Sequence, residues 1–161
     1  MKKTGGTNHI CEVCADIIDM ALPIQCVEAV FLGAYLTSGM TTIIRIPMSF
    51  KSKFRSKIHR HIVLAVFAGG KWGCLGISRR KCLMYKQIEF TSLWDLIQEF
   101  IDAYTTVYHR LLTVYFGLPM PHDLRVDQKV VWKAIKLRLT NADQAQNKSK
   151  LDMFLQEVIK S

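Results

Sequence analysis

The pattern of hydrophobic and polar positions predicts alternating helices and strands along the chain. Apolar residues at helical spacing predict a short helix over residues 10–20 and a longer one over residues 23–37. Pro23 suits the first turn of the second helix, because it lacks an N–H that would be unpaired there. The β-branched stretch 41–47 predicts a strand, and residues 49–60, with several Lys and Arg, predict a basic loop.

Two apolar runs, residues 61–67 and 72–77, predict a β-hairpin, because the double glycine between them is typical of a tight turn. His61 begins the first of these strands and Ser78 ends the second. The open ends of an antiparallel pair lie side by side, so we expect Ser78 next to His61.

The second half of the chain is predicted to contain a long helix, a strand and a further helix. Residues 91–113 carry an apolar stripe at helical spacing that includes Tyr108, whereas His109 falls among the polar positions and is expected to face solvent. Residues 130–139 alternate in polarity, as in a half-buried strand. Residues 140–149 are expected to form a polar linker, followed by an amphipathic helix that caps the domain or binds a partner.

The composition indicates one globular domain, because the chain has 161 residues and half of them are hydrophobic. No apolar run approaches the ~20 residues of a membrane-spanning helix. The first residues are polar and lack the hydrophobic core of a signal peptide. Five cysteines, an odd and modest number, favour a reducing compartment and hence the cytoplasm, with export by a route without a signal peptide as an alternative.

The net charge is +9, from 22 basic and 13 acidic residues, and the cations are concentrated in two stretches. The first contains Lys51, Lys53, Arg55, Lys57 and Arg60, and the second contains Arg79, Arg80 and Lys81. Such stretches commonly form solvated loops, and otherwise they bind acidic protein segments or nucleic acid. The chain lacks zinc-finger, basic-zipper and RRM motifs, and few aromatic residues lie near the cations. An acidic peptide is therefore favoured over nucleic acid as the partner.

Cys11 and Cys14 form an isolated C-x-x-C motif. A zinc site needs two further ligands, and Cys74 and Cys82 do not have the spacing of a zinc ribbon. The motif also lacks the strand–helix context of a thioredoxin-like redox site. The sequence therefore predicts no metal or other cofactor.

Cys26 and His61 are the candidate catalytic residues. Cys26 falls in the first turn of the predicted helix, where free N–H groups and the positive end of the helix dipole stabilise a thiolate. A lone Cys in an apolar helix is more commonly a small buried residue. However, a strand-borne imidazole such as His61 is the second group that a thiol hydrolase requires, and the fold could bring the two together.

The sequence around these residues resembles the vasohibin family of tubulin-tail carboxypeptidases. The resemblance extends from about Ala21 to about Leu139 and weakens after Lys86. Four blocks carry it: Ala21-Leu22-Pro23-Ile24 leading into Cys26-Val27-Glu28-Ala29-Val30, Ile46-Pro47-Met48-Ser49-Phe50-Lys51, His61-Ile62-Val63-Leu64, and Gly73-Cys74-Leu75-Gly76-Ile77-Ser78-Arg79-Arg80 continuing to Leu83-Met84-Tyr85-Lys86.

The resemblance implies a role for each matching residue. Cys26 corresponds to the nucleophile, and His61 corresponds to the general base. Ser78 corresponds to the residue that orients the imidazole, and Leu83 lies where a main-chain carbonyl also faces it. Arg79 corresponds to the basic residue that holds the terminal carboxylate of the substrate. The family removes the C-terminal Tyr from the tail of α-tubulin.

Three positions depart from the family pattern. Gln25 stands where the family usually has a Lys beside the nucleophile. The substrate-holding Tyr of the family precedes the nucleophile, but the first Tyr here is Tyr35. Only 25 residues precede Cys26, whereas the family has a long helical region there that builds much of the groove for the small vasohibin-binding protein. We therefore expect a family core with a shortened N-terminal region, in which docking of that partner is in question.

Together these observations predict an α/β (α+β) fold of transglutaminase or papain-like kind, with a mainly antiparallel sheet packed by helices. Residues 1–139 are expected to form the protease core, and residues 140–161 the linker and C-terminal helix. The expected function is a thiol carboxypeptidase acting on the α-tubulin tail, located in the cytoplasm on the cytoskeleton, with Arg79, Arg80, Lys51, Lys53 and Arg55 contacting the acidic substrate. The alternatives are a binding module for microtubules or a partner and, less favoured, a nucleic-acid-binding protein.

Overall fold

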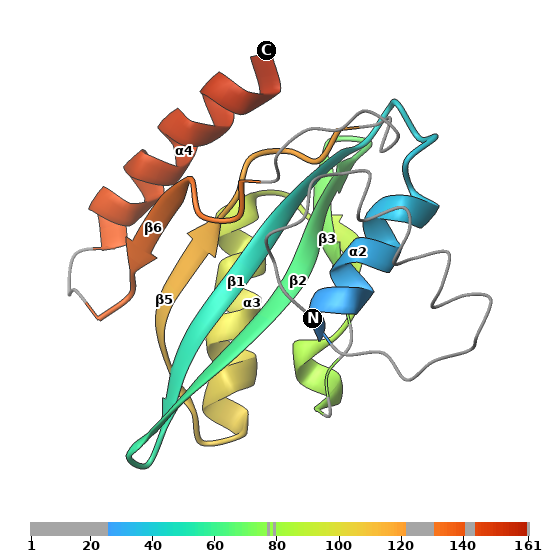
Figure 1. The fold of residues 1–161 in the computed structure, drawn as a ribbon. Coiled ribbons are helices and arrows are strands. Elements are labelled where there is room, and N and C mark those ends of the chain that lie inside the picture. Colours follow the sequence, from blue (N-terminus) through green and yellow to red (C-terminus); the bar gives the residue numbers. More distant parts are fainter. Residues whose placement is uncertain (1–25, 77, 79, 122–130, 141–143, 161) are drawn as a thin grey trace, which may run out of the picture.

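The computed structural model describes residues 26–76, 78, 80–121, 131–140 and 144–160, and its centre is one six-stranded sheet (Figure 1). The strand order is β4-β3-β2-β1-β5-β6, and every pair of neighbouring strands is antiparallel. The strands are β1 (Ile44–Phe54), β2 (Lys57–Ala68), β3 (Lys71–Leu75), β4 (Lys86–Phe90), β5 (Arg110–Phe116) and β6 (Ile135–Arg138). The helices are α2 (Cys26–Leu36), the 3-10 helix η1 (Lys81–Leu83), α3 (Leu93–Thr106) and α4 (Gln144–Lys160). The predicted antiparallel α+β architecture is therefore confirmed.

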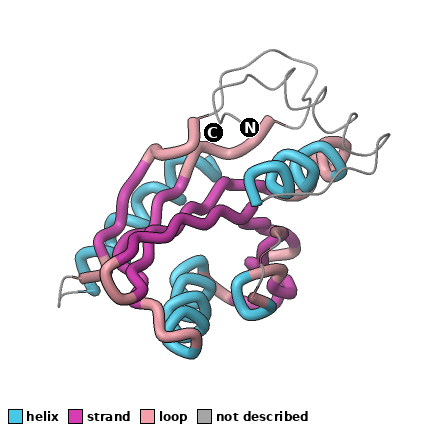
Figure 2. Tube along the Cα trace, turned by 60° about the horizontal axis from the view of Figure 1, so that its bottom comes forward, coloured by secondary structure: helices cyan, strands magenta, loops and turns pink. Residues whose placement is uncertain are grey.

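The two faces of the sheet bury different sets of side chains. Alternate residues of β1, including Met48 and Phe50, join the main core with α3 and with Leu151 and Phe154 of α4. The opposite face packs against α2, where Phe31 lies in a second cluster with residues from β2. Figures 1 and 2 show α2 and α3 on opposite sides of the sheet.

The predicted basic loop over residues 49–60 is wrong, because this segment forms the turn of the β1–β2 hairpin and the adjoining parts of both strands. Its cations alternate with residues that the sheet buries, such as Phe50 at 1% exposure and Ser52 at 1%. That alternation is the two-residue period of a half-buried strand. The turn falls at Arg55, whose φ of 56° lies in the left-handed region. The high charge of the segment obscured this period.

The predicted helix over residues 91–113 is wrong in its last part. Ser92 caps α3 by accepting a hydrogen bond from the Asp95 amide at 3.1 Å, but the helix ends at Thr106 and β5 begins at Arg110. Tyr108 takes a φ of 63° between them and is 84% exposed, so it is not part of the core stripe. The apolar residues of β5 satisfy both periods in sequence, and pairing with β1 decides between them.

Other element boundaries also differ from the prediction. The β2–β3 hairpin is confirmed, with Gly69 and Gly70 at positive φ in its turn. β4 was not predicted. The strand predicted over residues 130–139 is shorter in the structure, where it corresponds to β6. Helix α4 already begins at Gln144, within the predicted linker. The helix predicted over residues 10–20 lies outside the described residues.

Arg45 fixes the C-terminal end of α2 to the sheet. Its guanidinium is fully buried and donates hydrogen bonds to the carbonyl of Ala34 at 2.6 Å, to Thr37 Oγ1, and to the carbonyls of Met120 and Pro121. A cation near the last carbonyls of a helix also interacts favourably with the helix dipole. The position of α2, and hence of its first residue, therefore depends on Arg45.

We expect Arg45→Lys to lower the free energy of unfolding by about 2 kcal/mol, because a lysine ammonium cannot reach all the buried acceptors that the planar guanidinium satisfies. Chemical denaturation measures the loss. An exposed substitution of the same kind, Arg138→Lys, serves as the control and is expected to change stability little. Equal stability of the Arg45→Lys variant and the wild type would show that Arg45 does not hold α2.

Candidate active site

His61 lies on β2 with its ring against the main core. Its cross-strand partner on β1 is Phe50, and the two rings stack with centroids 6.0 Å apart and an interplanar angle of 17°. The side chain is half-buried. A buried aromatic neighbour restricts the ring to few orientations, which a general base requires.

The second contact of His61 is with the main chain of η1. The ring Nε2 lies 2.7 Å from the carbonyl oxygen of Leu83, the position at which the family resemblance implied such a contact. A carbonyl can only accept, so Nε2 carries the proton and Nδ1 keeps its free lone pair. Burial lowers the pKa of His61, and the hydrogen bond to the Leu83 carbonyl opposes this in part. The ring is therefore a neutral imidazole with Nδ1 available to accept a proton.

The edge of β2 beside His61 is not paired with β3. The last pair of the two strands joins Leu64 and Leu75, three residues before His61 is reached. The chain then passes close to β2 through Gly76, where an added Cβ would lie 2.8 Å from Val63 Cγ1. The glycine thus permits a close approach of the chain to β2 at Val63.

If the register of β2 and β3 continued beyond the Leu64–Leu75 pair, Ser78 would fall opposite His61. Its hydroxyl oxygen accepts a hydrogen bond from the amide of Arg80 at 3.2 Å. A hydrogen bond between Ser78 and the His61 ring is not found among the described residues. The orienting role of Ser78 therefore stays a prediction.

Cys26 is the first residue of α2, and the structure describes its backbone but not its side chain. Gly33, seven residues later, packs beside Leu64 and Leu75. Seven helical residues span about 10 Å and three strand residues also span about 10 Å, so the start of α2 is level with His61 along β2. Figure 1 shows α2 running in the same general direction as β2.

The two candidate residues approach the sheet from different sides. α2 packs on the face that carries Ile62 and Leu64, whereas His61 belongs to the α3 face. A thiol at the start of α2 can therefore meet the imidazole only around the unpaired edge of β2. Among the described residues, the ladder between β2 and β3 does not extend to the level of His61.

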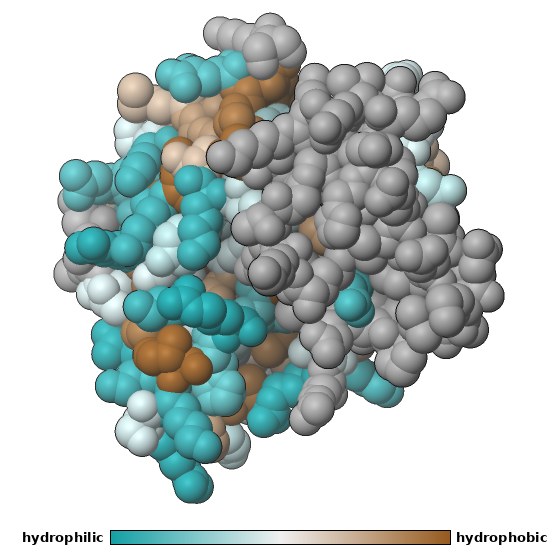
Figure 3. All heavy atoms as spheres, viewed as in Figure 1, coloured by the Kyte–Doolittle hydropathy of each residue, from teal (hydrophilic) through white to brown (hydrophobic). Residues whose placement is uncertain are grey.

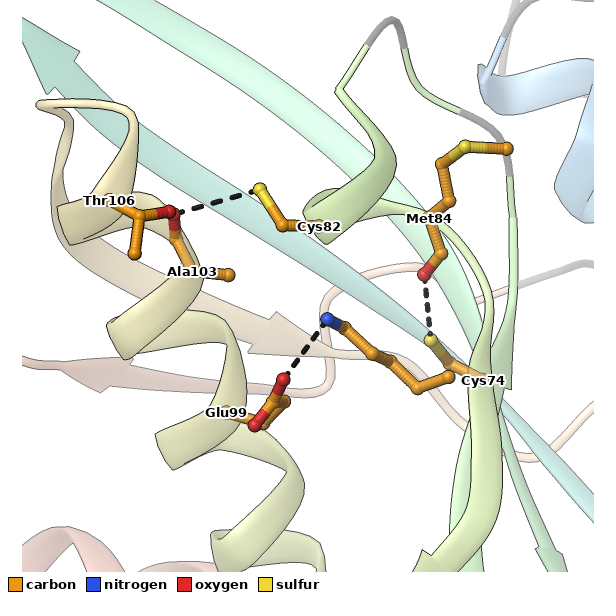
Figure 4. A network of polar contacts seen from close by, with 7 residues as sticks. Cys74, Cys82, Met84, Glu99, Ala103 and Thr106 are labelled. Atoms are coloured by element: carbon orange, nitrogen blue, oxygen red, sulfur yellow. Dashed lines mark hydrogen bonds and ion pairs between the residues drawn. The ribbon is translucent and has the colours of Figure 1, made fainter.

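Of the two described cysteines other than Cys26, Cys74 is a poor nucleophile. Cys74 is 1% exposed and its thiol donates to the Met84 carbonyl at 3.3 Å, and burial raises its pKa to about 12 (Figure 4). Cys82 points toward the Ala103 carbonyl of α3 at 3.8 Å. Cys11 and Cys14 lie outside the described residues. A thiolate is consequently not favoured at Cys74.

The predicted substrate-binding cations are placed in part. Arg79 lies outside the described residues, and Arg80 is exposed just before η1. Lys51 and Lys53 lie on one face of β1, and Arg55 lies in the hairpin turn. Lys51 and Lys53 are therefore held by a strand rather than by a loop.

The strand pairing places further cations beside Lys51 and Lys53 that the sequence analysis did not connect with these two residues. A row across four strands joins Arg138, Thr113, Lys51 and Arg60 on one face of the sheet. Neighbouring rows on this face contribute Lys136 beside Tyr115, and Arg110 beside Lys53. We call these six residues the basic face: Lys51, Lys53, Arg60, Arg110, Lys136 and Arg138. Hydrophilic residues cover much of this side around β1 and β5 (Figure 3).

The basic face has no acidic residue within its strands. Neither Asp nor Glu occurs in β1, β2, β5 or β6. The lysine and arginine charges on this face are thus not neutralised by carboxylates of the same strands. Such a surface attracts acidic partners over a longer range than a single ion pair does.

The described part of the chain lacks two other kinds of site. It contains no group of three or more His, Cys, Asp or Glu residues suited to holding a metal ion. Within the same residues, none of the helices has the length and apolar character needed to cross a bilayer.

The antiparallel sheet and its helices define an α+β core of transglutaminase or papain-like kind. The Vasohibin family model matches residues 1–159. The chain is also 41% identical over 133 residues to mouse tubulinyl-Tyr carboxypeptidase 1. That alignment covers 83% of this chain and 36% of the mouse protein, so the chain spans about a third of the length of this relative. The protein belongs to the vasohibin family.

Proposed function

We propose that the protein is a thiol-dependent carboxypeptidase that removes the C-terminal tyrosine from the tail of α-tubulin. The observation that carries the proposal is the half-buried contact between His61 Nε2 and the Leu83 carbonyl, which leaves Nδ1 as a base level with the start of α2. The name of the mouse relative states the reaction and the substrate. The family and the site residues thus support the same chemistry.

In the proposed reaction, Nδ1 of His61 takes the proton of the Cys26 thiol and the thiolate attacks the last peptide carbonyl. The imidazolium then gives that proton to the leaving amine, which releases free tyrosine and leaves an acyl-enzyme. Water, deprotonated by the same imidazole, hydrolyses the thioester and restores the thiol. The Leu83 carbonyl and Ser78 keep the ring oriented throughout.

Selection of the last residue requires a group that binds the terminal carboxylate. We assign this role to Arg79, because its guanidinium can bind a carboxylate through two charge-assisted hydrogen bonds. A fixed carboxylate clamp restricts cleavage to the end of the chain. Arg80, adjacent to it, adds positive charge on the same segment.

The basic face and Arg55 are proposed to attract the acidic tail before it reaches the site. Exposed charges act over about one Debye length, ~8 Å at physiological ionic strength. Their contribution therefore belongs to association rather than to the chemical step. The site of action is accordingly proposed to be microtubules in the cytoplasm.

Replacing Lys51, Lys53, Arg60 and Arg138 with Gln is expected to raise KM several-fold at low salt and to flatten its salt dependence, with kcat nearly unchanged. Arg79→Ala is the comparison, because loss of a clamp should reduce kcat/KM by about 10²-fold or more at every salt concentration. Kinetics across a salt series with a tyrosine-ending acidic peptide measure both. Identical salt profiles for the two variants would contradict the separation into attraction and clamping.

A second candidate function is binding without hydrolysis. The basic face favours it, because those cations could engage microtubules whether or not Cys26 reacts. Gln25 also favours binding without hydrolysis, since the family usually carries a Lys at this position beside the nucleophile. A microtubule pulldown that survives Cys26→Ala shows binding independent of the nucleophile, but does not by itself exclude hydrolysis.

Incubation of the purified chain with tubulin distinguishes the two functions. We expect the terminal tyrosine to be lost from α-tubulin, and no loss with Cys26→Ala. Mass spectrometry of the tail peptide measures the loss. The reaction is run with and without the small vasohibin-binding protein, which is proposed as a partner. Binding to microtubules with no tyrosine loss in either condition would establish the binding module instead.

A further inference from the structure

A second cluster of titratable residues lies beside His61, near the turn of the β1–β2 hairpin. The ring of His109 contacts that of His59, with centroids 4.9 Å apart, and stacks on Phe54 at 5.2 Å with an interplanar angle of 13°. Its Nδ1 lies 3.0 Å from the hydroxyl of Ser52, which is 1% exposed. Side chains of two strands, β1 and β2, therefore contact the His109 ring, which the sequence pattern had placed in solvent.

Two backbone irregularities bring this cluster together. The β1–β5 register shifts between Lys51 and Ser52, so a bulge lies where the serine meets His109. Tyr108 takes a left-handed conformation just before His109 and starts β5 in a new direction. Bulges are frequent next to functional sites because they re-aim side chains.

Arg80 supplies a positive charge near the His109 ring, and no carboxylate contact with this ring is found among the described residues. Burial lowers the pKa of His109, and the nearby His59 and Arg80 lower it further. The other described groups around the ring are neutral: Ser52 and Phe54 from β1 and Tyr104 from α3. The acid nearest to Tyr104 along α3 is Asp102, which is exposed and accepts a hydrogen bond from Gln98.

The cluster is adjacent to the proposed catalytic base. His59 and His61 are two residues apart on β2, so they share the α3 face of the sheet at a separation of about 7 Å. Arg80 lies three residues before Leu83, whose carbonyl binds His61. A peptide whose end reaches His61 therefore has residues within reach of the cluster.

We propose that His59, His109 and Arg80 form an anion subsite that takes an acidic side chain of the peptide substrate, upstream of the bond that is cut. The inference rests on the proposed function, since it places the subsite relative to His61. A carboxylate would pair with the Arg80 guanidinium and with Nε2 of His109, because Nδ1 is occupied by Ser52. The serine hydroxyl can donate to a neutral ring and accept from a protonated one, so it supports both states.

The subsite predicts a pH dependence with a defined sign. Without a ligand, the lowered pKa of His109 keeps it neutral near pH 7. A bound carboxylate stabilises the protonated imidazole of His109, so binding is accompanied by proton uptake. Affinity for an acidic peptide should therefore increase as the pH falls through about 6.5, while glutamate side chains, with pKa values of about 4.3, remain ionised.

The test measures binding in the Cys26→Ala background, so that the peptide is not consumed. Fluorescence anisotropy at pH 5.5, 6.5 and 7.5 compares one peptide ending in Glu-Glu-Tyr with one ending in Gln-Gln-Tyr. We expect the Glu peptide to bind about fivefold more tightly at pH 5.5 than at pH 7.5. The double variant His59→Gln with His109→Gln should lose this difference, and the Gln peptide should show none with either protein.

Two controls separate the subsite from general effects. Lys71→Gln removes an exposed cation at the β2–β3 turn and should leave the pH dependence intact. His109→Gln alone retains a side-chain amide for Ser52, and thermal melting verifies that the variants fold. The proposal is overturned if the double variant keeps the wild-type pH dependence, or if it loses affinity equally for both peptides.

Failure of the subsite and failure of the proposed function are distinguishable. Tyrosine release from the Glu peptide by the protein with Cys26 intact tests the function, whereas pH-linked affinity tests the subsite. Release without pH-linked affinity overturns the subsite alone. Affinity with the expected pH dependence but no release supports the subsite and counts against the peptidase.

Discussion

Cys26→Ala is expected to reduce turnover of a tyrosine-ending acidic peptide by about four or more orders of magnitude, with the fold unchanged. Removal of the nucleophile in a thiol or serine peptidase typically leaves only the small residual rate that substrate binding and polar groups supply. Cys26 is the first residue of α2, so a change to Ala should not disturb the packing of Phe31 and Ala34 against β2. Release of free tyrosine measures the rate, and circular dichroism verifies the fold.

The matched control is Cys82→Ala. Cys82 is half-buried and weakly bonded to the Ala103 carbonyl, so its loss should change turnover little. Cys26→Ser should be as inactive as Cys26→Ala, because a serine hydroxyl is not ionised by a neutral imidazole of lowered pKa. Wild-type turnover in Cys26→Ala would exclude this residue as the nucleophile.

His61→Ala is expected to have a similarly large effect, whereas His59→Ala should change kcat/KM by no more than about tenfold. The difference follows from their surroundings: His61 stacks on Phe50 and binds the Leu83 carbonyl, while His59 is exposed. Parallel kinetics of the two variants on the same peptide measure it. Equal losses would leave neither histidine assigned as the base.

The surroundings of His61 also set the pH dependence of the wild type. Burial lowers the pKa of this imidazole, so it stays unprotonated below the ordinary value of about 6.5. The midpoint of the acidic limb of the kcat/KM profile, which His61 controls, should therefore lie below pH 6.5. The same burial costs stability in acid, because the unfolded chain takes up a proton at a higher pH than the folded one does.

Much of the fold is present in the sequence as periodicity. The apolar stripe of α3 with its Ser92 cap, the double glycine of the β2–β3 turn and the apolar face of α2 each depend on neighbours along the chain. Such local signals can be read without knowledge of the tertiary structure. The predicted elements that agree with the structure are of this kind.

The β1–β2 hairpin and β5 could not be predicted in the same way. Lys51 and Lys53 made the first segment resemble a loop, and Leu111 and Leu112 made β5 resemble the continuation of α3. In both cases pairing with a distant strand selects the conformation, and this pairing is not a local property. The local sequence of these segments therefore does not distinguish a strand from a loop or a helix.

The residues of the candidate site also differ in whether local sequence or long-range pairing identifies them. His61 and Cys26 stand out locally, because His61 begins an apolar run and Cys26 falls in the first turn of a predicted helix. The hairpin pattern predicted Ser78 next to His61, and family resemblance supplied Leu83 and Arg79. The cluster around His109 and the basic face arise only when strands far apart in sequence are aligned. Charge density marked half of the basic face, and no local signal marked Arg110 or Arg138 as part of it.

Covalent trapping tests the central claim most directly. The native chain is treated near pH 7 with an epoxide that carries a tyrosine-like carboxylate, and the modified residue is identified by peptide mass mapping. We predict a single adduct on Cys26, greatly slowed in His61→Ala and absent from Cys74, whose pKa is about 12. Labelling of Cys82 at the same rate as Cys26, or of Cys26 equally fast without His61, would contradict the assignment of a Cys26–His61 peptidase site.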